Sequence, residues 1–80
     1  MNFDINKYDN ISFHKDEIVS RRIRALLLWF EFQVLDSDFS KEIEIDFIDS
    51  IIDTMVDQEW YEVAVFFKDL KLDKLRQMFK

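Results

Sequence analysis

The sequence predicts an all-α fold, a small antiparallel bundle of three to four helices that forms a single domain over residues 1–80. The chain contains no glycine and no proline, the two residues that most often interrupt helices. Apolar residues recur at i, i+3 and i+4 along most of the sequence, which is the spacing of one helical face. Turn-forming residues cluster at residues 36–40, so we expect a helix on either side of that segment.

The first helix is expected over about residues 13–35, after an irregular N-terminal arm at 1–11 that lacks a sustained period. Ser12 is the predicted N-cap, and Asp16 and Glu17 follow it where the helix dipole favours negative charge. One face of this helix is marked by apolar residues that are four, three, four and four positions apart: Val19, Ile23, Leu26, Phe30 and Val34. Residues 25–30 are apolar all round, which predicts a helix covered on more than one side.

Ser40 is the predicted N-cap of the second helix, whose apolar stripe comprises Phe47, Ile48, Ile51, Ile52, Met55 and Val56. Strict alternation over residues 43–47 would also suit a short strand, but the stripe that continues downstream favours a helix.

A third helix is expected over about 59–70. The apolar phase changes at residues 70–72, which predicts a separate short helix from about Asp73. Whether 42–57 and 59–70 form one helix or two stays open, because the helical step continues through the junction.

The composition excludes several classes of catalytic site. Without glycine the chain has no Gly-rich phosphate-binding loop, and without cysteine it has no thiol nucleophile, disulfide or cysteine-ligated zinc. The single histidine, His14, is expected in solvent near a helix N-terminus. We therefore expect no enzyme, no catalytic residues, no cofactor and no metal site.

Charge is distributed in blocks, and the net charge is −6. Residues 36–62 carry ten acidic residues against Lys41 alone, whereas residues 63–80 carry five basic residues against two acidic ones. An acidic chain is a poor match for a nucleic-acid backbone or an anionic membrane. We find no signal-peptide pattern, and the apolar run at 25–30 is far too short to span a bilayer. The expected location is cytoplasmic, with no direct nucleic-acid and no membrane partner.

Five carboxylates form an acidic ridge on the predicted outer face of the second helix: Glu42, Asp46, Asp49, Asp53 and Asp57. Like charges at i, i+4 oppose helix formation slightly, so the ridge has either a solubilising role or a binding role. The favoured interpretation is a solvated face. A surface for a basic partner and a mimic of nucleic-acid phosphates are the alternatives. Arg21, Arg22 and Arg24 are expected to pair with this ridge or with that of a second copy.

The run Asp36-Ser-Asp38-Phe-Ser40 resembles the first half of an EF-hand calcium loop, and Ile43 and Glu44 fall at its eighth and ninth positions. The resemblance fails at the sixth position, where Lys41 replaces glycine, and at the twelfth, where Phe47 replaces glutamate. A polar turn that ends one helix and caps the next is the favoured interpretation. A cation-binding helical hairpin remains a further alternative.

Hydrophobic residues make up 49% of the chain, which is more than one small core can cover. Adjacent aromatic residues point in different directions on a helix, so one member of each pair must face something other than the core. We therefore expect a small protein-binding regulator or inhibitor, homodimeric, whose Ile-, Lys-, Asp- and Phe-rich composition suits an AT-rich bacterial or phage genome. The candidate partner-binding residues are Asp46, Asp49, Asp53, Trp60, Tyr61, Phe66 and Phe67.

Overall fold

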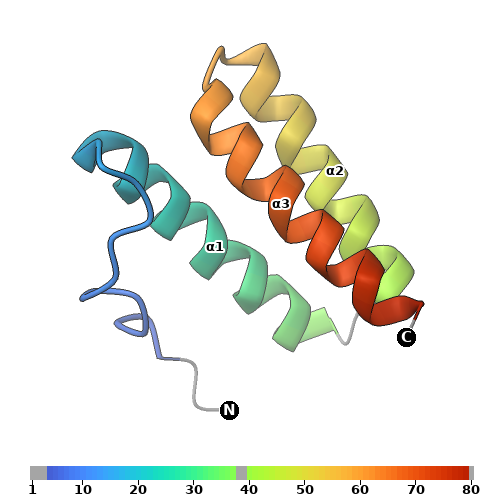
Figure 1. Cartoon of the computed structure of the whole chain (residues 1–80). Coiled ribbons are helices and arrows are strands. Elements are labelled where there is room, and N and C mark those ends of the chain that lie inside the picture. Colours follow the sequence, from blue (N-terminus) through green and yellow to red (C-terminus); the bar gives the residue numbers. More distant parts are fainter. Residues whose placement is uncertain (1–3, 38–39, 80) are drawn as a thin grey trace. The chain divides into compact units, whose positions relative to one another are not determined.

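The computed structural model describes residues 4–37 and 40–79, and within them it contains three helices and no strand. These are α1 (Glu17–Ser37), α2 (Lys41–Asp57) and α3 (Tyr61–Met78) (Figure 1). The predicted all-α class is confirmed, with three helices where three to four were expected. The chain divides into two compact units, Met1–Ser37 and Asp38–Lys80, which are described separately below. No helix in the described ranges is long and apolar enough to cross a bilayer.

In the first unit, α1 begins at Glu17 and is capped by Asp16. The Asp16 carboxylate Oδ1 accepts the backbone N–H of Ile18 at 2.9 Å and that of Val19 at 3.4 Å. The prediction of Ser12 as N-cap is wrong: residues 14–16 form a bend, and the Ser12 hydroxyl donates to the His14 carbonyl oxygen at 3.0 Å. A carboxylate satisfies the free N–H groups and also complements the helix dipole, so the helix starts at the aspartate.

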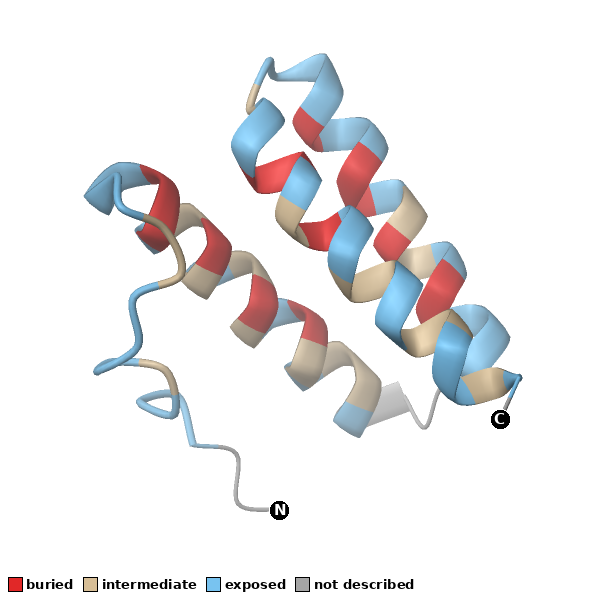
Figure 2. Ribbon diagram, viewed as in Figure 1, coloured by how far each residue is buried: buried red, intermediate tan, exposed pale blue. Residues whose placement is uncertain are grey.

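The buried side of α1 follows the predicted face with a small change of phase. Val19, Ile23 and Phe30 are buried as expected, together with Leu27, whereas Leu26 and Val34 are only partly buried. Figure 2 shows the buried residues recurring along one side of the helix. The opposite side of α1 therefore carries the remaining apolar residues of the 25–30 run, as taken up below.

The second unit is a hairpin of α2 and α3. Ser40 caps α2 as predicted, since its side-chain oxygen accepts the N–H of Ile43 at 3.3 Å. Residues 43–47 are helical, so the alternative of a strand there is wrong. The buried apolar residues of the hairpin are Ile45, Ile48, Ile51, Ile52, Met55, Val63, Ala64 and Phe67.

A tight turn at residues 58–60 separates α2 from α3, so the two segments form two helices and are not fused. The prediction of a break at 70–72 followed by a separate helix is wrong, because α3 is continuous to Met78. Lys71 reaches α2 and pairs with Asp49, whereas Leu72 is exposed. The change in apolar phase thus places Leu72 on the outer side of an unbroken helix, and no residue there is a strong helix breaker.

Candidate protein-interaction surfaces

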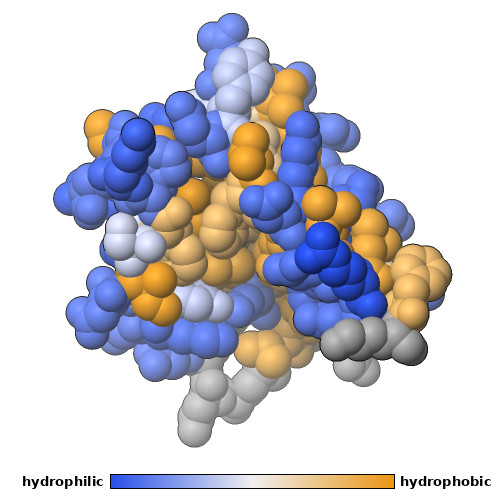
Figure 3. All heavy atoms as spheres, in the orientation of Figure 1, coloured by the Kyte–Doolittle hydropathy of each residue, from blue (hydrophilic) through white to orange (hydrophobic). Residues whose placement is uncertain are grey.

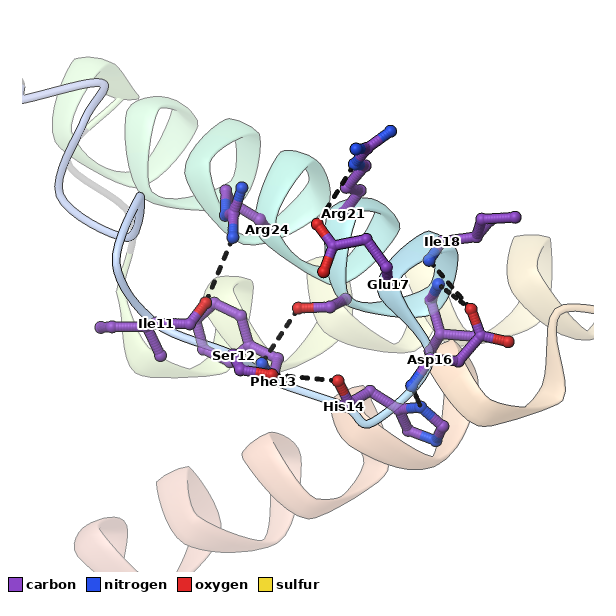
Figure 4. Close-up of polar contacts among 11 residues, drawn as sticks. Ile11, Ser12, Phe13, His14, Asp16, Glu17, Ile18, Arg21 and Arg24 are labelled. Atoms are coloured by element: carbon purple, nitrogen blue, oxygen red, sulfur yellow. Dashed lines mark hydrogen bonds and ion pairs between the residues drawn. The ribbon is translucent and has the colours of Figure 1, made fainter.

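The segment that precedes α1 is fastened to the first turns of that helix (Figure 4). The Phe13 backbone N–H donates to the Ser20 hydroxyl oxygen at 3.0 Å, and the Arg24 guanidinium Nη2 donates to the Ile11 carbonyl oxygen at 3.2 Å. His14 lies at the helix N-terminus, where its Nδ1 accepts the Asp16 backbone N–H at 2.9 Å. These contacts hold residues 11–16 against the N-terminal half of α1.

Glu31 is the second attachment point of the N-terminal segment. The Tyr8 hydroxyl donates to Glu31 Oε1, and Lys7 Nζ lies 3.4 Å from the same oxygen. Burial, together with the hydrogen bond and charge of Glu31, raises the pKa of Tyr8 above its ordinary value. The negative charge of Glu31 also raises the pKa of Lys7. Neutral tyrosine and charged lysine are therefore the forms that this cluster favours.

The outer face of α1 is apolar from Ala25 onward and carries one arginine near its N-terminal end. Five residues separated by four, three, four and three positions define it: Ile18, Arg22, Ala25, Trp29 and Phe32. Trp29 is 48% and Phe32 47% exposed, and Leu35 extends the surface at its edge. Arg24 and Glu31, the charged residues between positions 23 and 35, contact the N-terminal segment instead. The stretch from Ala25 to Leu35 thus presents a charge-free outer face to solvent.

A second row of exposed apolar residues runs along the outer side of α3: Tyr61, Val65, Leu72 and Phe79. Lys68 and Arg76 are exposed on the same helix and fall between these positions. Figure 3 shows the hydrophobic atoms of the α2–α3 hairpin interspersed with hydrophilic ones on the face in view. The α3 row is therefore divided by charges at two positions, whereas the outer face of α1 has one charged residue, Arg22, between Ile18 and Ala25.

Most of the acidic ridge faces solvent, as the solvated-face interpretation expects. Asp46, Asp53 and Asp57 are exposed, and so is Glu42. Asp49 differs, because its Oδ1 lies 2.7 Å from Lys71 Nζ of α3. The candidate residues Asp46 and Asp53 are consequently open to a partner, whereas Asp49 contributes to the hairpin itself.

Glu44 is a buried carboxylate that the sequence did not single out as a structural ion-pair residue. It is 7% exposed and lies between two lysines, with Lys74 Nζ 3.4 Å from Oε1 and Lys41 Nζ 3.7 Å from Oε2. Lys71 and Lys74 are two of the five basic residues in the segment 63–80. Both lysines pair with α2 of their own chain.

The adjacent aromatic residues differ in burial, as expected for neighbours that point in different directions on a helix. Phe67 is fully buried, and Phe66 packs edge-on against it with ring centroids 5.3 Å apart while remaining partly exposed. Tyr61 is exposed and Trp60 is partly exposed. Phe67 is therefore a core residue that a partner does not reach, whereas the other three are accessible to different degrees.

The contacts found for Arg21 and Arg24 are made with residues other than those of the acidic ridge. Arg21 Nε lies 3.3 Å from Glu17 Oε1 one turn earlier in α1, and Arg24 donates to the Ile11 carbonyl as described above. The i, i+4 partner of Arg21 is available as soon as the helix forms, so it competes well with distant carboxylates.

The EF-hand-like register is not formed as a loop. α1 extends to Ser37, and α2 includes Lys41, Ile43, Glu44 and Phe47, so nine positions of the twelve-residue register 36–47 are helical, namely 36–37 and 41–47. Asp38 lies outside the described residues. Within residues 4–37 and 40–79, no three acidic or histidine side chains gather in a way that could hold a metal ion.

Comparison with known proteins found no matching family model, no matching curated protein and no matching solved structure.

Proposed function

We propose that this chain is a non-enzymatic protein-binding module that works as a homodimer. It would act in the cytoplasm as a small regulator or inhibitor. We further propose that its three helices pack as one antiparallel bundle in a single domain. The observation that carries the proposal is the amount of large apolar surface left exposed on α1 and α3, including Trp29, Phe32, Tyr61 and Leu72. Monomeric proteins rarely expose contiguous apolar patches above a few hundred Å². Covering such a surface with a protein stabilises the complex through the hydrophobic effect.

The chemistry of the polar residues supports binding over catalysis. Asp46, Asp53 and Asp57 are spread along an exposed helix face and do not converge on a desolvated point, which is the arrangement that shifts carboxylate pKa values in active sites. His14 is engaged with the backbone at the start of α1. Neither group is placed as a general acid or base would be.

The oligomeric state tests this proposal. Light scattering coupled to size exclusion should report a dimer of the 9.8 kDa chain at micromolar concentrations, dissociating on dilution. A monomer at every concentration would contradict the homodimer and leave a different protein as the cover for the exposed surface.

An acidic mimic of nucleic acid is the second candidate function, and the exposed carboxylates of the ridge favour it. Glu42, Asp46, Asp53 and Asp57 form an acidic surface on α2 that could bind the basic groove of a nucleic-acid-binding protein. Binding of that kind weakens steeply as salt rises, because exposed charges are screened over about 8–10 Å at physiological ionic strength. Self-association through apolar surface should change little with salt, so salt titration separates the two functions.

A further inference from the structure

We infer that the outer face of α1 is the self-association surface, and that two copies pair through antiparallel α1 helices. This inference rests on the homodimer proposed above and adds which face is buried and in which orientation. The occupant of the face is therefore a second copy of this chain.

The spacing of the face is that of a helix-pairing seam. Ile18, Arg22, Ala25, Trp29 and Phe32 alternate steps of four and three, which keeps them in line along a helix that supercoils with another. The buried side of α1, with Ile23 and Phe30 at its centre, lies opposite. The seam is thus additional to the core face, which explains why residues 25–30 are apolar all round.

The size of the side chains selects the antiparallel orientation. In a parallel pair in register, Trp29 would meet Trp29 and Ala25 would meet Ala25, which crowds one layer and leaves a void in the other. In an antiparallel pair with Ala25 level with Trp29 of the other copy, every such layer combines one small and one large side chain. The two-fold symmetry then repeats the same contact on both sides.

The charges select the same orientation. A parallel pair would place Arg22 beside Arg22, whereas the antiparallel register places it level with Phe32, whose ring face attracts a guanidinium. Helical side chains lean toward the N-terminus, so Arg21 and Arg22 would lean toward the C-terminal end of the other α1. That end carries partial negative charge and has no basic residue in its last turn. Each copy therefore supplies the cations that the other lacks.

The area is sufficient for a weak dimer. Ile18, Trp29, Phe32 and Leu35 are each about half exposed, and a fully buried aromatic side chain covers roughly 150–250 Å². Trp29 and Phe32, each about half exposed, thus offer roughly 150–250 Å² per copy, and Ile18, Leu35 and the stems of Arg21 and Arg22 add to it. The total over two copies falls in the class of interfaces below about 1,200 Å², which is the size of weak, transient association. The α3 row is the competing face. Lys68 and Arg76 divide it at two positions, whereas the α1 seam is uninterrupted from Ala25 through Trp29 to Phe32.

The experiment compares matched substitutions on the two faces by sedimentation equilibrium. Phe32→Glu on α1 and Leu72→Glu on α3 replace side chains of nearly equal exposure, 47% and 50%. We expect Phe32→Glu to raise the dimer dissociation constant at least about 100-fold and Leu72→Glu to change it less than about twofold, since central apolar anchors dominate small interfaces. Ala25→Glu is the second α1 variant, and it should weaken the dimer in the same way because it places a charge in the seam. Since Glu is a good helix former at an exposed position, α1 itself should remain folded. Circular dichroism confirms the helical content of each variant.

Orientation is measured with a single spin label at Ile18→Cys, since the chain has no other cysteine. In the antiparallel register, the two labels are about 27 Å apart along the helix axis, from 18 residues at 1.5 Å each, whereas a parallel pair brings them close together. A dimer dissociated by Leu72→Glu but not by Phe32→Glu or Ala25→Glu would overturn this inference and leave the homodimer standing. A short label distance would overturn the antiparallel pairing. A wild-type chain that is monomeric throughout would overturn the homodimer as well.

Discussion

The Trp60 backbone N–H donates to the Met55 carbonyl oxygen across 2.8 Å, and this bond closes α2 with Glu59 in the left-handed conformation at φ 62°. The Glu59 N–H donates in turn to the Val56 carbonyl at 3.0 Å. The two bonds together are a Schellman motif, whose left-handed position is usually glycine. A chain without glycine has placed a glutamate there, at a steric cost of about 1–2 kcal/mol.

Replacing Glu59 by glycine should therefore stabilise the protein. The substitution removes the clash between Cβ and the following carbonyl, while glycine adds entropy to the unfolded chain, so we expect a net gain of about 0.5–1 kcal/mol. Urea denaturation measures it. Gln58→Gly is the matched control, because Gln58 is right-handed at φ −83° and glycine should destabilise it. Equal effects at the two positions would contradict the role of the left-handed backbone.

Asp16→Ala tests the cap of α1. The aspartate accepts two helix N–H groups, so its loss should destabilise the protein by about 1 kcal/mol and lower the melting temperature by several degrees. Ser12→Ala is the comparison, since the Ser12 hydroxyl contacts a bend and no helix N–H. The cap assignment fails if Ser12→Ala is the more destabilising change.

Glu44→Ala should be among the more destabilising changes on α2. It leaves the partly buried ammonium of Lys74 without this carboxylate, and we expect a loss of about 1–3 kcal/mol. Glu44→Leu should cost less, because an apolar side chain of similar volume fills the same position. Glu42→Ala, at an exposed position, should stay within about 0.5 kcal/mol of wild type by chemical denaturation.

The ridge aspartates should divide into two classes. Asp46→Asn with Asp53→Asn should leave stability unchanged or raise it by a few tenths of a kcal/mol, because like charges at neighbouring turns are relieved. Asp49→Asn should lower stability by up to about 1 kcal/mol through the loss of the Lys71 pair. Denaturation at low and high salt distinguishes them by sign, since screening should reduce a destabilisation by Asp49→Asn and a stabilisation by the Asp46 and Asp53 changes. A large loss from the Asp46 and Asp53 changes would show internal pairing.

Alkaline pH should loosen the N-terminal segment. Burial and Glu31 raise the pKa of Tyr8 above 10.0, so the folded state holds that proton more tightly than the unfolded chain does. The resulting stability is fully present below about pH 10 and is lost as the pH rises through the folded-state pKa. The raised pKa of Lys7 acts in the same direction.

Tyrosinate absorbance in a Tyr61→Phe background isolates Tyr8, as these are the two tyrosines of the chain. Its midpoint should lie above 10.0 and fall when Glu31 is changed to Gln, though only in part because burial remains. A midpoint that does not respond to Glu31→Gln would contradict the contact.

The helical class, the Ser40 cap and most core positions of α2 were predictable because each depends on residues close together in sequence. Without glycine or proline the chain has few ways to avoid helix, and a stripe such as Ile48, Ile51, Ile52 and Met55 records which side is buried. The aromatic pairs were predictable in the same sense, since adjacent side chains on a helix must diverge. The start of α1 was not predictable, because Ser12 and Asp16 are both good caps by residue type, and only the structure shows that the Asp16 carboxylate accepts the N–H groups of Ile18 and Val19.

The sequence by itself determined that this protein is helical, acidic, and richer in large apolar residues than one small core can hold. Only the tertiary structure decided which of the large apolar side chains stay exposed outside the core. Glu31 and Arg24 contact the N-terminal segment, so the outer face at Trp29 and Phe32 is uncharged. Asp49 of the acidic ridge and the buried Glu44 pair with lysines of α3. The sequence shows which oppositely charged residues could form ion pairs. Which pairs form depends on the distances between residues far apart in the chain, because the Coulomb energy falls with distance.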